Sequence, residues 1–142
     1  MFLDSLRGRF DLHGEEEAIV WGGAATTYRS LLESIDHWEG VVEEHGVERG
    51  TVVSLEADFS PTGVALLLAL MQRACVVVPL TSSAGSQKAE CREIAEVEVS
   101  IEVCEDASPR WTRTGVTAKH PILEKLRDLQ HPGLIYFSSG ST

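Results

Sequence analysis

Residues 134–142 read Leu134-Ile135-Tyr136-Phe137-Ser138-Ser139-Gly140-Ser141-Thr142. The first four residues are apolar, aromatic or β-branched, and such a run predicts a short buried strand. The next five residues are small and carry four hydroxyl groups and one glycine. A loop of this kind can turn backbone N–H groups and hydroxyls toward one anion, and Gly140 permits the positive φ that a close approach requires. A strand that runs into such a loop is typical of a phosphate site, although a flexible Ser/Gly tail has the same composition.

The middle of the chain predicts a βαβ unit. Thr51–Leu55 and Cys75–Leu80 are apolar, β-branched runs that we expect to form strands. Ser60-Pro61 is typical of a helix start, with an N-cap residue followed by proline at the first helical position. The helix that follows is apolar all round over Val64–Met71, which predicts burial on several sides. The fold class that we predict is therefore α/β, with βαβ units, a mainly parallel sheet and flanking helices.

Further elements are expected on both sides of this unit. The longest is an amphipathic helix over Tyr28–His45, with Thr27 as its N-cap and Trp38 on its apolar face as a core residue. A segment without clear periodicity, Asp106–Gly115, is predicted to be a connecting loop. The other expected elements are a short amphipathic helix (Met1–Phe10), a hairpin (Ala18–Trp21 and Ala25–Thr27), two helices (Lys88–Ala95 and Pro121–Leu129) and a strand with alternating glutamates near a sheet edge (Val97–Val103).

Three parts of the sequence resemble adenylate-forming enzymes, the superfamily of acyl-CoA synthetases, peptide-synthetase adenylation domains and luciferases. Gly133-Leu-Ile-Tyr-Phe-Ser-Ser-Gly-Ser-Thr142 is similar to the first half of their phosphate-loop signature, whose lysine half is not present in this chain. Thr27-Tyr28-Arg29-Ser30-Leu31 resembles an early helix start of the family. Val76-Val-Val-Pro-Leu80 resembles a family strand, although Ala74 stands where the family usually has glycine.

The resemblance implies that residues 1–142 form a single N-terminal α/β segment of an incomplete AMP-binding domain, with no second domain. It implies an ATP-dependent ligase that activates a carboxylate as an acyl-adenylate and then transfers it to a thiol. The expected substrates are ATP with Mg²⁺, a small carboxylate, and CoA or a carrier-protein thiol. The nucleotide-binding residues that it implies are Ser138, Ser139, Gly140, Ser141 and Thr142. It assigns no catalytic residue and no metal ligand here, and we expect the isolated 142-residue chain to be inactive.

Composition limits the other possibilities. The chain has 22 acidic and 12 basic side chains and a formal charge of −10, which disfavours nucleic acid and anionic membranes as partners. No apolar run approaches the length of a membrane span, and no secretory signal is visible. The three cysteines are odd in number and lack metal-ligand spacing, so we expect reduced thiols and a cytoplasmic location.

Two other motifs are weak. Glu56 and Asp58 could be read as a pair of catalytic carboxylates, but at the end of a strand we expect them to be solvated. The sequence also lacks a Gly-x-x-x-x-Gly-Lys-Ser/Thr loop and a Gly-x-Gly-x-x-Gly fingerprint. The main alternative to a ligase segment is a standalone acidic α/β domain that binds a partner without catalysis. A self-sufficient phosphate-binding module ranks third, because half a loop in an acidic protein has little to hold several phosphate charges.

Overall fold

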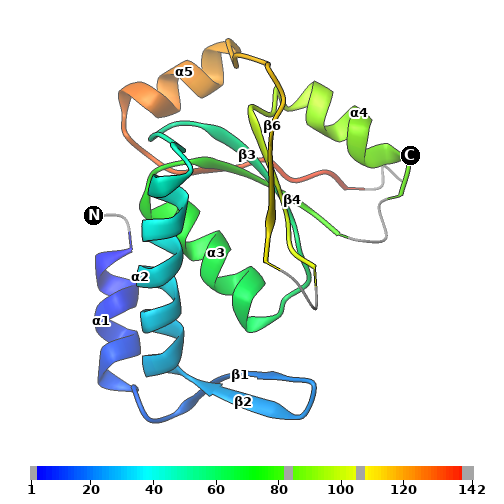
Figure 1. The fold of residues 1–142 in the computed structure, drawn as a ribbon. Helices are drawn as coiled ribbons and strands as arrows, with labels where there is room; N and C mark the ends of the chain where they lie inside the picture. The colour runs from blue at the N-terminus through cyan, green and yellow to red at the C-terminus, as the bar shows by residue number, and fades with distance from the viewer. Residues whose placement is uncertain (1–2, 82–84, 105–107, 139–142) are drawn as a thin grey trace.

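The computed structural model of the protein describes residues 3–81, 85–104 and 108–138. Figure 1 shows a central sheet with helices on both sides and a separate hairpin next to the N-terminal helices. The elements in chain order are α1 (Asp4–Leu12), β1 (Glu17–Trp21), β2 (Ala24–Thr27), α2 (Tyr28–Glu44), β3 (Val52–Glu56), α3 (Pro61–Gln72), β4 (Val76–Leu80), α4 (Gln87–Ile94), β5 (Val99–Glu102), β6 (Arg110–Arg113), α5 (Pro121–Asp128) and β7 (Gly133–Leu134).

The central sheet has five strands in the order β6-β5-β3-β4-β7. β3 pairs with β4 and with β5 in parallel, β4 pairs with β7 in parallel, and only β6 is antiparallel to its neighbour. This confirms the predicted mainly parallel α/β fold, because α3 connects the adjacent parallel strands β3 and β4 as a βαβ crossover. Pro79 lies within β4, and its backbone nitrogen points away from β3. The N–H that proline lacks therefore removes no hydrogen bond between β3 and β4.

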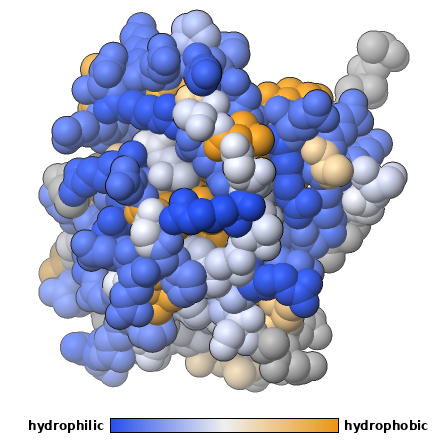
Figure 2. Space-filling view, turned by 45° about the horizontal axis from the view of Figure 1, so that its top comes forward, coloured by the Kyte–Doolittle hydropathy of each residue, from blue (hydrophilic) through white to orange (hydrophobic). Residues whose placement is uncertain are grey.

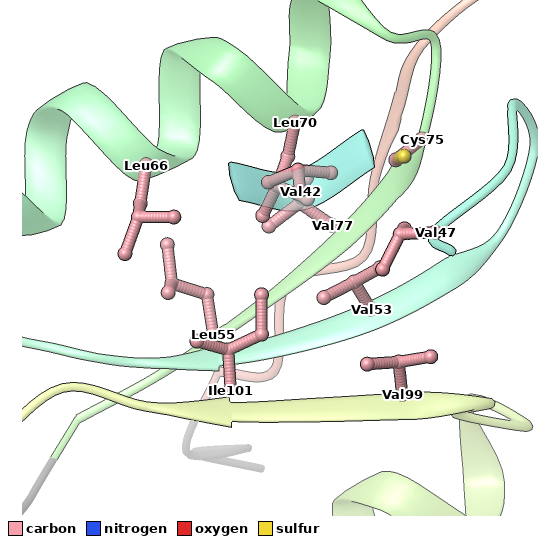
Figure 3. Packing of buried hydrophobic residues seen from close by; sticks show 10 residues of the cluster. All are labelled: Val42, Val47, Val53, Leu55, Leu66, Leu70, Cys75, Val77, Val99 and Ile101. Atoms are coloured by element: carbon pink, nitrogen blue, oxygen red, sulfur yellow. The ribbon is translucent and has the colours of Figure 1, made fainter. Parts of the chain in front are cut away.

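Helices α2 and α3 cover one face of the sheet. Figure 3 shows Leu66 and Leu70 of α3 pointing toward Val77, Leu55 and Ile101 on three neighbouring strands. All five side chains are at most 4% exposed. The apolar helix predicted after Ser60 is therefore a core helix, and its burial provides much of the hydrophobic free energy of this domain.

The other face is covered by α4 and α5. Ala95, at the end of α4, and Leu123 of α5 pack on Val76, Val78 and residues of the same cluster. Figure 1 shows both helices on the side of the sheet opposite α3. Because helices lie on both faces, strands β3 and β4 are buried on both sides, as parallel strands generally are.

The other N-terminal elements pack around α2. α1 packs on α2, α2 packs on α3, and the two-stranded hairpin β1–β2 contacts α2. Thr27 caps α2 as predicted, since its side chain accepts a hydrogen bond from the Ser30 N–H at 3.2 Å. Ser60 caps α3 in the same way, accepting from the Gly63 N–H at 3.2 Å.

One element differs from the expectation. The Asp106–Gly115 segment was predicted to be a loop, but residues 110–113 form β6, an edge strand antiparallel to β5. The prediction was wrong because Arg110-Trp-Thr-Arg113 has a single apolar residue, Trp111, and four residues are too few to show a period. The strand forms because Trp111 packs half-buried against the core and the backbone pairs with β5.

One face of the protein is largely polar. Figure 2 shows hydrophilic residues over most of the face that it presents, with apolar residues in separate patches. Within the described residues, no helix is both long and apolar enough to cross a membrane.

Candidate nucleotide-loop site

The predicted phosphate loop follows β7, which lies beside β4 at one edge of the sheet. The Gly133 N–H donates to the Cys75 carbonyl at 3.1 Å, and the Ile135 N–H donates to the Val77 carbonyl at 2.9 Å. Ser138, the first residue of the loop, is exposed. The other predicted binding residues (Ser139, Gly140, Ser141 and Thr142) lie outside the described residues.

The burial of this strand differs from the prediction. Leu134 and Tyr136 are 57% and 75% exposed, so the expected buried strand is an open edge strand, and only two residues have regular strand pairing. The physical reason is that α3 covers the sheet over β3 and β4, while no described residue pairs with the outer side of β7. Ile135 and Phe137, which alternate with the exposed pair, pack against the cluster under α4 and α5.

β7 ends at the edge of the sheet where ligands of parallel α/β sheets usually bind, and the predicted loop follows it in the sequence. The carboxyl ends of β3, β4, β5 and β7 all lie at this edge because these strands are parallel. The chain leaves β3 toward α3 on one face and leaves β4 toward α4 on the other face. Neighbouring strands whose connections diverge in this way open a crevice at their carboxyl ends, which is the usual ligand position in such sheets.

Two hollows lie at this edge. One of about 130 Å³ is lined by Leu55, Gly63, Pro79 and Tyr136, among others, and lies between the ends of β3 and β4. The other, of about 610 Å³, is lined by Trp21, Trp38, Asp58, Ser60, Thr62, Val103, Cys104, Ser108 and Pro109. Trp38, predicted as a core residue, is half-buried: it packs against the core and also lines the larger hollow.

The β3–α3 turn that borders both hollows is closed tightly. A Cβ atom at Gly63 would lie 2.2 Å from the Asp58 carbonyl oxygen, so only glycine fits there. This close approach fixes the backbone between the end of β3 and the first turn of α3.

A charged cluster missed from the sequence lies at the same edge. The Glu56 side chain is only 13% exposed, and its carboxylate accepts hydrogen bonds from Lys88 Nζ and from Arg92 Nη2, the latter at 3.1 Å. The expectation that Glu56 is solvated was therefore wrong. Two cations of α4 cover it, and the spacing of Lys88 and Arg92 (i, i+4) was the available signal, because it places both on one helix face. Asp58 is exposed, as expected.

The thiols show no special site. All three cysteines are free, and Cys75 is fully buried at the start of β4. Burial raises the pKa of the Cys75 thiol to about 12, because the thiolate would lose its hydration. Among the described residues, no group of three or more His, Cys, Asp or Glu side chains could hold a metal ion.

Comparison with solved structures identifies the fold. The N-terminal subdomain of NpsA from Klebsiella oxytoca, in complex with 3-hydroxyanthranilyl-AMSN, matches with a TM-score of 0.70 and 19% identity over 96% of this chain and 37% of its own. The chain therefore has the fold of the NpsA N-terminal subdomain. VinN in complex with L-aspartate matches with a TM-score of 0.65 and 19% identity over 93% of this chain and 33% of its own. IdnL1 matches with a TM-score of 0.62 and 18% identity over 76% of this chain and 26% of its own.

The likeness lies in the fold rather than in close sequence similarity. No protein-family model matches the sequence, and no curated protein matches it significantly. The chain spans about a third of the length of the NpsA and VinN chains that it matches. The N-terminal subdomain fold was predicted from the sequence and is confirmed.

Proposed function

We propose that this chain is the N-terminal part of an ATP-dependent ligase that activates a carboxylate as an acyl-adenylate and passes it to a thiol, in the manner of an acyl-CoA synthetase. The observation that carries the proposal is the coincidence of two independent features. A loop sequence similar to the phosphate loop of adenylate-forming enzymes follows β7. β7 ends at the edge where ligands of parallel α/β sheets usually bind, in a chain with the fold of the NpsA N-terminal subdomain.

The loop chemistry fits a polyphosphate. Ser138 begins the loop on the exposed edge of the sheet, and residues 138–142 carry four hydroxyls and one glycine. In the proposed site the hydroxyls and N–H groups of Ser138, Ser139, Ser141 and Thr142 hold phosphate oxygens, and Gly140 lets the backbone approach them. Mg·ATP would supply the α-phosphate that the carboxylate attacks and the pyrophosphate that leaves.

The role of this chain in that reaction is positional and electrostatic. Donors that are fixed before the reaction stabilise the charge that develops on the leaving phosphates and keep them in line with the attacking carboxylate. The family's lysine half of the loop has no counterpart in this sequence. The 142 residues alone are therefore expected to bind Mg·ATP weakly at best and not to catalyse adenylation.

The test is carboxylate-dependent exchange of pyrophosphate into ATP by the protein as its native source produces it. Its intact mass, measured first, shows whether the polypeptide continues past the loop. Exchange that is lost in the double variant Ser139→Ala and Ser141→Ala, and retained in the matched control Ser100→Ala on β5, supports the proposal. Native protein without exchange for any of a broad panel of carboxylic acids, or purified 142-residue chain with exchange, would contradict it.

A second candidate is a standalone acidic α/β domain that binds a protein partner. The exposed apolar side chains of Leu134 and Tyr136 favour it, because they form part of a surface that a partner could cover. This candidate predicts that Mg·ATP at millimolar concentration leaves the thermal unfolding midpoint of the native protein unchanged. The ligase proposal predicts a rise in that midpoint, because a ligand that binds only the folded state stabilises it.

A further inference from the structure

The larger of the two hollows at the carboxyl edge of the sheet has no role in the ligase proposal. Its volume of about 610 Å³ lies within the range of roughly 300–1,000 Å³ that is usual for small-molecule sites. It is lined by the end of β1, the middle of α2, the β3–α3 turn and residues between β5 and β6. Figure 1 shows the hairpin and the first turn of α3 at the same end of the molecule. The fold therefore brings segments that are distant in the sequence around one space.

Two tryptophan side chains line this hollow from different elements. Trp38 of α2 packs against the core, and its ring contacts the His37 ring edge-on at a centroid distance of 5.1 Å, so its position is well supported. Trp21, at the end of β1, is 42% exposed although it is a large aromatic residue. The face of an indole ring carries negative electrostatic potential and attracts a cation more strongly than a phenyl ring does. The two rings favour a ligand that carries positive charge.

The charges around the hollow also favour a cation. Among the described lining residues, Asp58 is the only one with a charged side chain. Arg110, which follows the lining residue Pro109, is paired with Glu102 at 3.8 Å. Residues 105–107 lie outside the described residues, and their sequence contains no basic side chain. In a protein with a net charge of −10, the hollow is therefore expected to attract cations and to repel anions.

The N-terminus of α3 opposes this attraction in part. Ser60 and Thr62 place the first turn of α3 beside the hollow, and a helix N-terminus carries a charge of about +0.5. Asp58 carries a full negative charge, so the sum at this wall stays negative. The close approach of Gly63 to the Asp58 carbonyl fixes the backbone that carries the carboxylate. The Ser60 hydroxyl accepts from the Gly63 N–H and can still donate its own proton to a polar group of a ligand.

We propose that the larger hollow binds a small organic cation, with an alkylated ammonium group against the rings of Trp21 and Trp38 and with Asp58 as the counter-ion. A primary ammonium group is strongly hydrated and loses hydrogen bonds to water when it lies on a ring. Methyl groups on the nitrogen remove this cost and add apolar contact with the indoles, which is why aromatic sites select quaternary ammonium ligands. The site shares no residue with the phosphate loop, so the inference goes beyond the proposed ligase function.

The test uses choline as the probe, titrated to high millimolar concentration into the ¹⁵N-labelled 142-residue chain. NMR reports the indole Nε1–H signals of the three tryptophans separately. We expect the signals of Trp21 and Trp38 to shift, whereas Trp111 lies outside this hollow and serves as an internal control. The uncharged analogue of choline, in which carbon replaces the nitrogen, has the same shape. It is expected to bind about tenfold more weakly, because it has no cation–π attraction and no attraction to Asp58.

Two variants separate the contributions of charge and ring. Asp58→Asn is expected to weaken choline binding several-fold and to leave the affinity for the uncharged analogue unchanged. The matched control is Asp128→Asn, which makes the same change at an exposed carboxylate at the end of α5 and should leave both affinities unchanged. Trp21→Leu is expected to weaken choline binding about tenfold, because one of the two rings is lost.

The proposal would be overturned by equal affinities for choline and its uncharged analogue, or by equal choline affinities in Asp58→Asn and Asp128→Asn. A Trp111 shift as large as those of Trp21 and Trp38, or no shift at all, would also overturn it. If Trp21→Leu does not fold, the two aspartate variants still decide, because each changes one exposed side chain without changing its size. None of these outcomes bears on pyrophosphate exchange, so failure of this inference leaves the ligase proposal standing.

Discussion

The two edges of the central sheet are built in opposite ways. At the β6 edge, two of the four side chains are arginines, and Arg113 Nη2 donates to the His45 and Gly46 carbonyls at 2.9 and 3.1 Å. At the β7 edge, residues 133–138 carry no charged side chain, and Leu134 and Tyr136 are exposed. Charged side chains on an edge strand discourage pairing with another chain.

The difference indicates that β6 has the sequence of a protected edge strand, whereas β7 has the sequence of an interior strand. A run such as Leu134–Phe137 normally belongs to a strand with neighbours on both sides. In β7 the N–H groups of residues 133 and 135 bond to β4, so those of Leu134 and Tyr136 point outward. The region nearest the proposed nucleotide site is therefore the least protected part of the sheet, and four measurements test this difference between the two edges.

The largest loss of stability is expected for a substitution in the edge strand β6. Trp111→Ala should lower the free energy of unfolding by about 3 kcal/mol, because a large half-buried ring that packs on the core and stacks on His45 at 4.1 Å is lost. Leu134→Ala at the open edge is the matched comparison and should cost less than about 1 kcal/mol, since most of that side chain is already in water. Urea unfolding measures both. Equal losses would mean that the two edges do not differ as described.

A smaller loss is expected where α5 is anchored before β7. The Arg127 side chain donates to the Gly50 and Ala118 carbonyls, both at 2.9 Å, and to Glu98 Oε2 at 3.0 Å. Arg127→Met should lower the free energy of unfolding by about 2 kcal/mol, because it leaves these part-buried acceptors with fewer donors.

Arg127→Met should also speed hydrogen exchange of the Gly133 and Ile135 amides, which hold β7 to β4. Arg9→Met on the exposed surface of α1 is the control and should change stability by less than about 0.5 kcal/mol. Exchange at β7 that is insensitive to Arg127→Met would show that α5 does not anchor this strand.

The third measurement concerns the pH dependence of stability at Cys75, whose carbonyl accepts the first hydrogen bond from β7. Because burial raises the pKa of this thiol from 9.0 to about 12, the unfolded chain loses its proton first as pH rises. The contribution of the Cys75 thiol to the free energy of unfolding is fully present below pH 9. It declines between pH 9 and 12, with a slope approaching 1.4 kcal/mol per pH unit for this one group.

Cys75→Ala should flatten that part of the stability curve relative to the wild type, as measured by urea unfolding between pH 8 and pH 10. Thiol alkylation of the native chain at pH 8 gives a second readout. Cys91 and Cys104 are partly exposed and should react, while Cys75 should not. Rapid alkylation of native Cys75 would mean that the start of β4 opens as readily as β7.

The sequence was sufficient for the elements whose signals are local. Thr27 as a cap, Ser60-Pro61 as a helix start and the apolar runs of β3 and β4 are each decided within a few residues. Their order alone then restricts the topology, because a parallel pair joined by one helix has one usual handedness.

The sequence was insufficient where contacts with distant segments of the chain determine burial or strand formation. Glu56 is covered by cations 32 and 36 residues further along the chain, and β6 forms only because β5 is available to pair with Arg110–Arg113. β7 was predicted buried because the sequence reports the apolar character of a strand and not the neighbours that cover it. For the site itself, the phosphate loop stays a prediction from its motif, because residues 139–142 lie outside the described residues. The ion cluster of Glu56, Lys88 and Arg92 could not be predicted in this way, because it joins β3 to α4.

The smallest effect on stability is expected at the open edge, where it tests the contrast most directly. Tyr136→Lys should change the free energy of unfolding by less than about 0.5 kcal/mol, because the side chain is 75% exposed. It should nevertheless reduce self-association, since a lysine on an edge strand opposes pairing with a second chain. Light scattering over a concentration series measures this, with Arg110→Lys on β6 as the control that keeps its charge and should behave as the wild type. If the wild-type chain stays monomeric at millimolar concentration, the β7 edge is protected by something other than charge. If Tyr136→Lys associates as strongly as the wild type, association uses another surface, and the description of β7 as the unprotected edge is wrong.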